Sequence, residues 1–155
     1  MGMNEAKEHL RAMGLEERII VPEADTATVE LAAQALGVEP GRIAKTLTLQ
    51  HGESAMLLLT AGDTKINNAA FKARFHCKAK MLSPEDALRF TGHPAGGICP
   101  FGLPAPLPVY LDVSLKRFDT VFPACGTAHS AVRLTCEELE RASGALEWVE
   151  VCVSK

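Results

Sequence analysis

The stretch TVELAAQALGVEPGRIAKTLTLQHGESAMLLLT, residues 28–60, contains the two hydrophobic periods that decide the fold. Its first part repeats apolar side chains every three to four positions and stops at Gly37, which predicts a helix capped by Asp25 or Thr26. The expected buried stripe of this helix comprises Val29, Leu31, Ala32, Ala35 and Leu36. The stretch AMLLLT at 55–60 is apolar up to Thr60, which predicts a strand buried on both faces.

Between these elements, RIAKTLTLQ at 42–50 alternates like a strand and places Lys45 in the more apolar of its two stripes. One interpretation is that the lysine stem packs while the ammonium reaches water, since lysine is seldom fully buried. The other is that the ammonium lines a pocket at the end of the strand. A partly desolvated positive charge would act there most strongly on a carboxylate, a phosphate or a developing oxyanion.

On either side of this stretch, short helices and strands interleave, and several late strands follow one another closely. Further helices are predicted at 4–13, 66–74, 83–90 with Ser83 as its cap, and 135–144 with Thr135 and Glu138 as a capping box. Further strands are predicted at 18–22, 107–112, 119–124, 131–135 and 145–153. This order predicts an α+β fold with a mixed sheet. The length of 155 residues suggests that residues 1–155 form a compact single domain.

Composition excludes several classes of protein. The formal net charge of −3 gives no global basic field that would draw the chain to nucleic acid, although a local patch or weak binding to one RNA end stays open. Five cysteines without a CxxC pair favour a reducing cytoplasm over a disulfide framework. The chain shows neither a signal-peptide core nor an apolar run long enough to span a bilayer. We therefore expect a soluble cytoplasmic protein without a membrane partner.

The loop GGICPFGLP at 96–104 has three glycines, two prolines and no charge. Glycine lets a backbone approach a ligand closely and proline stiffens the chain, so we expect this loop to hold a ligand. Cys99 and Cys125 lie in predicted loops, where a nucleophilic thiol would need a base or cation such as His129 to lower its pKa. Spare cysteines are commoner, and the spacing of these residues with His93 matches no strong zinc pattern.

Three stretches together carry a resemblance: TVELAAQALGVEPGRIAKTL at 28–47, GGICPFGLPAPLPVYLD at 96–112, and the glycine-containing turn before AVRLTCEEL at 126–139. They resemble the YbaK/prolyl-tRNA-synthetase-associated domain family, whose members hydrolyse wrongly charged aminoacyl-tRNA. The resemblance covers nearly the whole chain after about residue 25, and its most specific parts are the AKTL strand and the Gly-x-x-x-Pro loop. It implies a curved, barrel-like mixed β-sheet surrounded by helices.

The resemblance also implies an activity and a site. The chain would be a free-standing aminoacyl-tRNA deacylase that acts in trans on tRNA-Pro carrying a small noncognate amino acid. Its partners would be the aminoacylated acceptor end of the tRNA and an aminoacyl-tRNA synthetase, and it would use no cofactor and no metal. Lys45 and Gly96 would be needed for activity. Substrate would be bound by Thr46, Gly97, Ile98, Cys99, Pro100, Asp112, Gly126 and His129.

Two positions in this resemblance allow other interpretations. The cysteinyl-tRNA branch has a serine and an aspartate where this chain has Ala124 and Ala131, which argues against a cysteine-specific activity. Asp112 matches an acidic residue of the family, but it could simply cap the turn that follows it.

The chemistry implied by the family needs few protein groups. An aminoacyl ester is already activated, so hydrolysis needs a placed water, donors for the oxyanion and a route for one proton. A small pocket rejects large side chains better than smaller ones, which favours alanine, serine, threonine, cysteine or 2-aminobutyrate as substrate. Gly96→Ala is expected to reduce activity more than stability. The alternative function is a non-catalytic module that binds aminoacyl-adenosine or a free amino acid and regulates a partner.

Overall fold

A computed structural model describes residues 2–155 and is built around a mixed central sheet. Its strand order is β6 (Phe122–Pro123), β2 (Ile43–His51), β3 (Ser54–Ala61), β5 (Val109–Asp112) and β8 (Glu147–Val149). Strands β2 and β3 form an antiparallel hairpin, whereas the other three pairings in this sheet are parallel. The prediction of an α+β fold with a mixed sheet is therefore confirmed.

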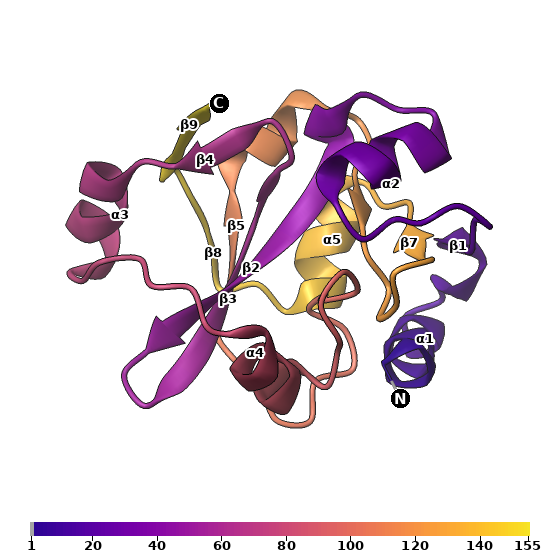
Figure 1. Cartoon of the computed structure of the whole chain (residues 1–155), viewed down its shortest axis with the longest axis horizontal. Helices are drawn as coiled ribbons and strands as arrows, with labels where there is room; N and C mark the ends of the chain where they lie inside the picture. Colours follow the sequence, from indigo (N-terminus) through magenta and orange to yellow (C-terminus); the bar gives the residue numbers. More distant parts are fainter. Residues whose placement is uncertain (1) are drawn as a thin grey trace.

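Two small two-stranded sheets and the helices surround this centre (Figure 1). Strand β1 (Ile19–Ile20) pairs with β7 (Ala131–Val132), and β4 (Thr64–Ile66) pairs with β9 (Cys152–Ser154). The α-helices are α1 (Met3–Ala12), α2 (Val29–Leu36), α3 (Asn68–Phe75), α4 (Pro84–Thr91) and α5 (Cys136–Ser143). Short 3-10 turns are η1 (Glu16–Arg18), η2 (Pro40–Arg42) and η3 (Val113–Arg117). Helices α1 and α2 lie on the right of Figure 1, and α3 lies on the left.

The core forms around β3, which is buried from Ala55 to Ala61 as its unbroken apolar sequence predicts. Leu57 and Leu59 pack with Phe101, Leu111 and other residues of the largest apolar cluster. The opposite face of the strand contributes Met56 and Leu58 to a second cluster. Strand β3 is covered on both faces and pairs with β2, so it fixes the position of β2 in the sheet.

Helix α2 follows the predicted pattern only in part. Gly37 ends it with a φ of 69°, as expected, but the cap is Thr28, whose hydroxyl accepts from the Leu31 amide at 3.2 Å. The predicted caps have other partners: Asp25 accepts from the Ala27 amide, and Thr26 is buried against Ser130. Leu31, assigned to the buried stripe, is 39% exposed, while Ala33 is buried instead. The buried side of the helix therefore centres on Ala32 and Ala33, which pack with Ile43, Phe122 and Ala131.

The predicted strand at 145–153 is interrupted. It divides into β8 and β9 because the Val151 amide between them donates to the Asp112 carboxylate at 2.8 Å. Strand β9 then pairs with β4, whose last residue, Ile66, was predicted to be the first residue of a helix. Strand β4 was not predicted because it is only three residues long, whereas most of β9 lies within the predicted strand.

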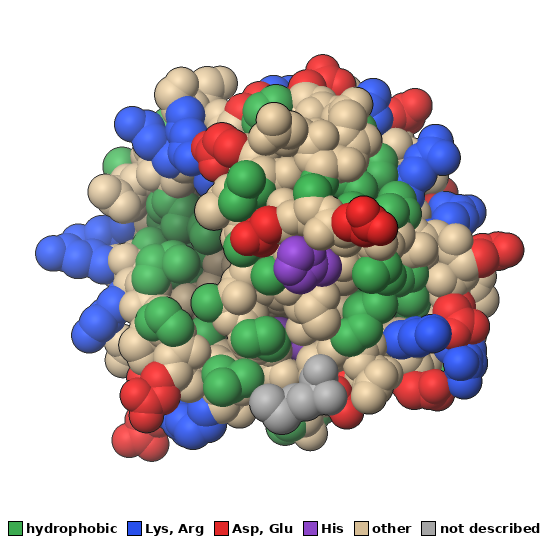
Figure 2. All heavy atoms as spheres, turned by 45° about the vertical axis from the view of Figure 1, so that its right-hand side comes forward, with side chains coloured by type: hydrophobic (Ala, Val, Ile, Leu, Met, Phe, Trp, Pro, Cys, Tyr) green, Lys and Arg blue, Asp and Glu red, His purple; other side chains and the backbone are tan. Residues whose placement is uncertain are grey.

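The face built from α1, α2, β1 and β7 carries many apolar side chains. In Figure 2, hydrophobic side chains lie around a histidine and acidic side chains at the middle of the view, whereas lysine and arginine side chains stand mainly along the margins. Exposed apolar residues of this region include Met13, Val21 and Leu31. Over residues 2–155, every helix is too short or too polar to cross a membrane.

Candidate functional site: a hollow at the edge of strand β2

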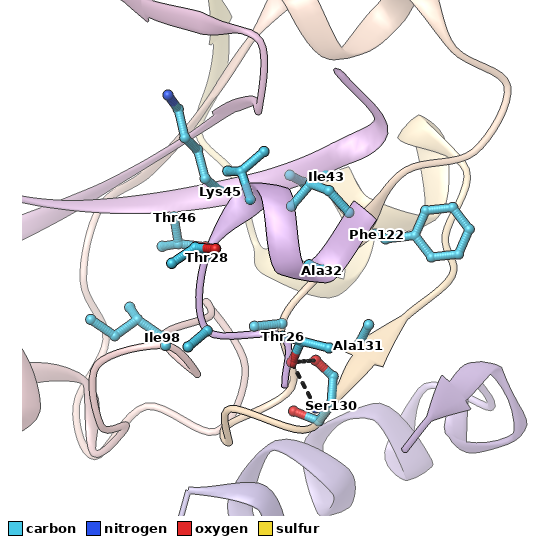
Figure 3. A pocket seen from close by; sticks show the side chains of 15 residues that line it. Thr26, Thr28, Ala32, Ile43, Lys45, Thr46, Ile98, Phe122, Ser130 and Ala131 are labelled. Atoms are coloured by element: carbon cyan, nitrogen blue, oxygen red, sulfur yellow. Dashed lines mark hydrogen bonds between the residues drawn. The ribbon is translucent and has the colours of Figure 1, made fainter. Parts of the chain in front are cut away.

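A hollow of about 160 Å³ opens between α2, β2, the end of β6 and the loop that carries Gly96 (Figure 3). Most of its wall is made of small or apolar side chains, with three threonines among them. The lining residues are Thr26, Ala27, Thr28, Val29, Ala32, Ile43, Ala44, Lys45, Thr46, Gly96, Ile98, Phe122, Ala124, Ser130 and Ala131.

The hollow exists because strand β6 is short. It pairs with β2 through two residues only, Ile43 with Phe122 and Ala44 with Pro123. The chain then leaves the sheet at Ala124, so the space beside the next residues of β2 is not filled by a strand. This space becomes part of the hollow, which Lys45 and Thr46 border from the β2 side.

The loop wall depends on two glycines. The Gly97 amide donates to Pro94 O at 3.0 Å, and the Gly97 carbonyl accepts from the Gly126 amide at 2.9 Å. A Cβ on Gly97 would lie 2.4 Å from the Thr127 nitrogen, so this close approach requires glycine. Gly96 has a φ of +88°, a conformation that other residues rarely adopt. The loop therefore presents main-chain atoms to the hollow.

The opposite wall is held by a buried hydroxyl pair. The Thr26 hydroxyl donates to Ser130 O at 3.4 Å and accepts from the Ser130 amide at 3.2 Å. The Ser130 hydroxyl accepts from the amides of Cys125 and Thr127 at 3.1 and 3.2 Å. These bonds tie the segment before α2 to the turn at 125–130 and keep the wall rigid.

Lys45 contributes its stem to the hollow, but its ammonium is turned away. The side chain is half-buried, and Nζ donates to the Thr64 carbonyl at 2.5 Å. Figure 3 shows the nitrogen pointing away from Ile98 and Thr28. Burial lowers the pKa of this ammonium, the positive charge of Lys155 lowers it further, and Asp63 partly opposes both. Within the part of the chain that the structure describes, the Thr64 carbonyl is the one hydrogen-bond partner of Nζ.

The predicted site residues divide into two sets. Lys45, Thr46, Gly96 and Ile98 line the hollow, whereas Gly97, Cys99, Pro100, Asp112, Gly126 and His129 do not. Gly97 and Gly126 support the hollow from behind through their mutual hydrogen bond. Pro100, within the same loop, is buried.

The two loop cysteines are core residues. Cys99 and Cys125 are both 0% exposed, and burial raises the pKa of each thiol, that of Cys125 to about 11. The Cys99 sulfur lies 3.4 Å from His93 Nε2, but this histidine is also fully buried. Both thiols therefore stay protonated and away from the hollow.

Asp112 and His129 have structural partners. The Asp112 carboxylate is 1% exposed and accepts from the amides of Ser114 and Val151 at 2.9 and 2.8 Å, which matches the capping interpretation. His129 is exposed, and its ring donates to Ala24 O at 3.2 Å. The hydrogen bonds of both side chains therefore join separate segments of the chain.

Sequence reasoning missed the segment Thr26–Thr28 as a wall, because Thr26 was interpreted only as a helix cap and Thr28 was given no role. Two positions of the wall did leave a signal. Ala124 and Ala131 had been noted as departures from the cysteinyl-tRNA branch, and both line the hollow. Over residues 2–155, histidine, cysteine, aspartate and glutamate side chains nowhere gather in a group of three that could hold a metal ion.

Comparisons with known proteins identify relatives of this chain. The model of the aminoacyl-tRNA editing domain family matches residues 23–142. The uncharacterized protein YwhH of Bacillus subtilis (strain 168) is 46% identical over 153 residues, which covers 98% of each chain. EbsC of Enterococcus faecalis, whose name describes a candidate Cys-tRNA(Pro)/Cys-tRNA(Cys) deacylase, is 27% identical over 117 residues, 74% of this chain and 71% of EbsC.

One solved structure is similar over almost the full length of the chain. It is described as a candidate trans-editing enzyme for prolyl-tRNA synthetase and superposes with a TM-score of 0.88 at 28% identity. The superposition covers 99% of this chain and 98% of that one.

Proposed function

The chain belongs to the aminoacyl-tRNA editing domain family, and from this premise we propose that it is a deacylase acting in trans on tRNA that carries a small noncognate amino acid. The tRNA we propose is tRNA-Pro, in line with the names of EbsC and of the similar solved structure. The observation that carries the proposal is the hollow beside Gly96 and Lys45, where a family member would hold its aminoacyl ester.

The size of the hollow supports a small substrate. Its volume of about 160 Å³ resembles that of a cavity of about 150 Å³ that binds benzene. A small side chain with its ester group fits such a space, and the terminal adenosine would lie outside it. Ala32, Ala124 and Ala131 leave room at the wall without adding charge. An amino acid with a side chain larger than this space would be excluded by size.

The reaction we propose uses water as the nucleophile. Cys99 and Cys125 are buried and protonated, and His129 points elsewhere, which disfavours a covalent intermediate. Main-chain groups at 96–98 would orient the water or the ester, and the vicinal hydroxyl of the ribose would help to move the proton. This scheme requires rigid backbone atoms, which the glycine contacts of this loop supply.

Lys45 would act on the nucleotide part of the substrate. Its ammonium stands at the rim with a single carbonyl partner, so it can exchange Thr64 O for a phosphate or ribose oxygen of the terminal adenosine. A phosphate would be the stronger partner because it carries a charge. The lowered pKa of the ammonium follows from burial and from Lys155, and a bound anion would oppose that shift.

Deacylation of a panel of mischarged tRNAs tests this function. We expect hydrolysis of at least one small noncognate aminoacyl ester on tRNA-Pro, and we expect Lys45→Ala to lower kcat/KM by about 100-fold, as for loss of one strong charged contact. Lys65→Ala is the matched control, because Lys65 is exposed on β4 beside Thr64 and does not line the hollow. A wild-type protein without turnover on any small aminoacyl-tRNA would favour the binding-module alternative.

A further inference from the structure

Strand β2 has an unpaired edge at Thr46. On the side of β2 away from β3, the Thr48 carbonyl accepts from the Leu82 amide at 3.0 Å, and the Gln50 amide donates to Lys80 O at 2.8 Å. Main-chain groups of a strand face alternate sides, so every second residue points the same way as Thr48 and Gln50. The N–H and C=O of Thr46 therefore point away from β3, toward the place where β6 would continue.

Strand β6 stops one step before it would reach these groups. Its last pairing is Pro123 with Ala44, and the next contact along this edge of β2 is the bridge between Leu49 and Met81. Within the described residues 2–155, no protein group pairs with the outward N–H of Thr46. The Thr46 hydroxyl is also closed off from solvent and has no partner in that part of the chain. Buried polar groups without partners are uncommon and call for an explanation.

The hollow lies against this edge and not against a face of the sheet. Four consecutive residues, Ile43 to Thr46, all line it. Their side chains alternate between the two faces of β2, so a single cavity can border all four only if it lies beside the strand. Phe122 and Ala124, at the end of β6, close the hollow along the same line. A ligand here would take the position of the missing strand segment, as in β-strand addition.

We propose that the aminoacyl group binds as one added residue of the sheet, with the Thr46 N–H donating to the ester carbonyl oxygen and the Thr46 C=O accepting from the α-ammonium. The inference rests on the proposed deacylase function and assigns the atoms that position its substrate. The main-chain groups of Thr46 bind atoms that all α-amino esters share. The apolar wall of the hollow then selects among side chains by their size.

The Thr46 N–H then also acts in the reaction. As the water oxygen bonds to the carbonyl carbon, the carbonyl oxygen gains negative charge, which the N–H stabilises. The bond from that carbon to the ribose oxygen breaks, and the ribose oxygen takes up the proton released by the water. The products are the free amino acid and tRNA with a free terminal hydroxyl, so no further reactant is needed.

Two proline substitutions separate this role from a structural one. Thr46→Pro removes an N–H that no strand uses, and proline is tolerated at such edge positions. We expect it to remain folded and to lose about 100-fold in kcat/KM, the loss typical of one oxyanion donor. Gln50→Pro is the matched control, because it removes an outward N–H that is bonded to Lys80. It should lower the melting temperature and leave the kcat/KM of the folded protein unchanged.

The outcomes distinguish the inference from the function on which it rests. A folded Thr46→Pro protein with wild-type kcat/KM overturns the inference and leaves the deacylase function intact. An inactive wild-type protein overturns the function itself. Thr46→Val completes the set, because it keeps the N–H and removes the unpartnered hydroxyl. If the main chain reads the ester, this variant keeps more activity than Thr46→Pro.

A measurement on the wild-type protein covers the case in which Thr46→Pro does not fold. The probe is 3′-deoxy-3′-(alanylamino)adenosine, which replaces the ester by an amide that is not hydrolysed. At saturation with this probe, we expect the Thr46 amide proton to shift downfield and to exchange more slowly with solvent. The Gln50 amide, already bonded to Lys80, should not change. An unmoved Thr46 amide at saturation would overturn the inference.

Discussion

The two halves of the loop at 96–104 are similar in composition but differ in their surroundings. Gly96 and Ile98, in the front half, border the hollow. Cys99 and Phe101, at the start of the back half, are 0% exposed and belong to the main core. The front half of the loop is therefore a surface that faces the hollow, and the back half is an anchor packed in the core.

The anchor is held by two buried or half-buried histidines. The Gly102 amide donates to His9 Nδ1 at 3.0 Å, and Nε2 of the same ring donates to Ala142 O at 2.6 Å, so His9 links α1 and α5 to the loop. His93 Nε2 donates to Phe101 O at 2.6 Å. Composition alone does not distinguish the two halves, because both contain glycine. In the front half glycine permits a ligand to approach, and in the back half it permits close packing against a helix.

The largest effect is expected from Gly102→Ala, in the back half. Gly102 has a φ of +67°, and a Cβ there would lie 2.4 Å from the main-chain carbon of Glu5 in α1. Because both partners are backbone, neither can move cheaply, and we expect a loss of about 3 kcal/mol in the free energy of unfolding. Urea unfolding measures this loss.

Gly52→Ala is the control for backbone strain alone. Gly52 has a similar φ of +63°, but nothing lies within 4 Å of the added Cβ. This variant should cost about 1 kcal/mol. Equal losses in the two variants would show that the contact between α1 and the loop contributes little, and the distinction between anchor and surface would weaken.

A smaller loss of stability and a larger loss of activity are expected from Gly96→Ala, in the front half. Its φ of +88° and a contact of 2.9 Å with the Ala27 Cβ make the substitution strained. The contacting atoms of Ala27 move only with the backbone, but they lie farther from the added Cβ than those that face Gly102, so we expect about 1–2 kcal/mol in stability. The added methyl group also lies at the wall of the hollow, and kcat/KM should fall by about 10-fold or more.

The prediction made from sequence was that activity falls more than stability, and the positive φ of Gly96 adds a definite cost in stability to it. Comparison with Gly52→Ala separates strain from obstruction, because that variant shares the strain and lies outside the hollow. If Gly96→Ala lost only stability, the front half of the loop would serve the fold as the back half does.

Much of the fold could be predicted because long apolar runs and helix caps are local signals. Strand β3 and helix α5, with its Thr135 and Glu138 capping box, are both found where expected. Strand β4 escaped prediction because three residues are too few to show a period, and the break between β8 and β9 escaped it because it depends on the contact of Val151 with Asp112. The cap of α2 was misassigned because three hydroxyl or carboxyl residues, Asp25, Thr26 and Thr28, compete for it within four positions.

The candidate site was harder to predict because it depends on where a strand ends. Lys45 and Gly96 were selected from sequence, and both line the hollow. The direction of the Lys45 ammonium, the burial of Cys99 and the open edge at Thr46 depend on contacts with residues distant in sequence. Local patterns contain no information about those contacts.

The smallest expected effect concerns pH and again distinguishes the anchor from the surface. Burial lowers the pKa of His93 from its usual 6.5, while the bond to Phe101 O and the charge of Glu5 partly oppose this shift. Nδ1 of the ring is buried and has no partner within residues 2–155, so a proton there would place an unsatisfied donor in the core. The unfolded chain therefore binds this proton more readily than the folded one. The stability that the neutral ring contributes is fully present above pH 6.5 and falls as the pH drops below it, by at most about 1.4 kcal/mol per pH unit.

Urea unfolding of wild type and His93→Gln between pH 7.5 and pH 5 measures how steeply the free energy of unfolding changes with pH in each protein. Equal slopes would show that the anchor does not depend on a neutral His93.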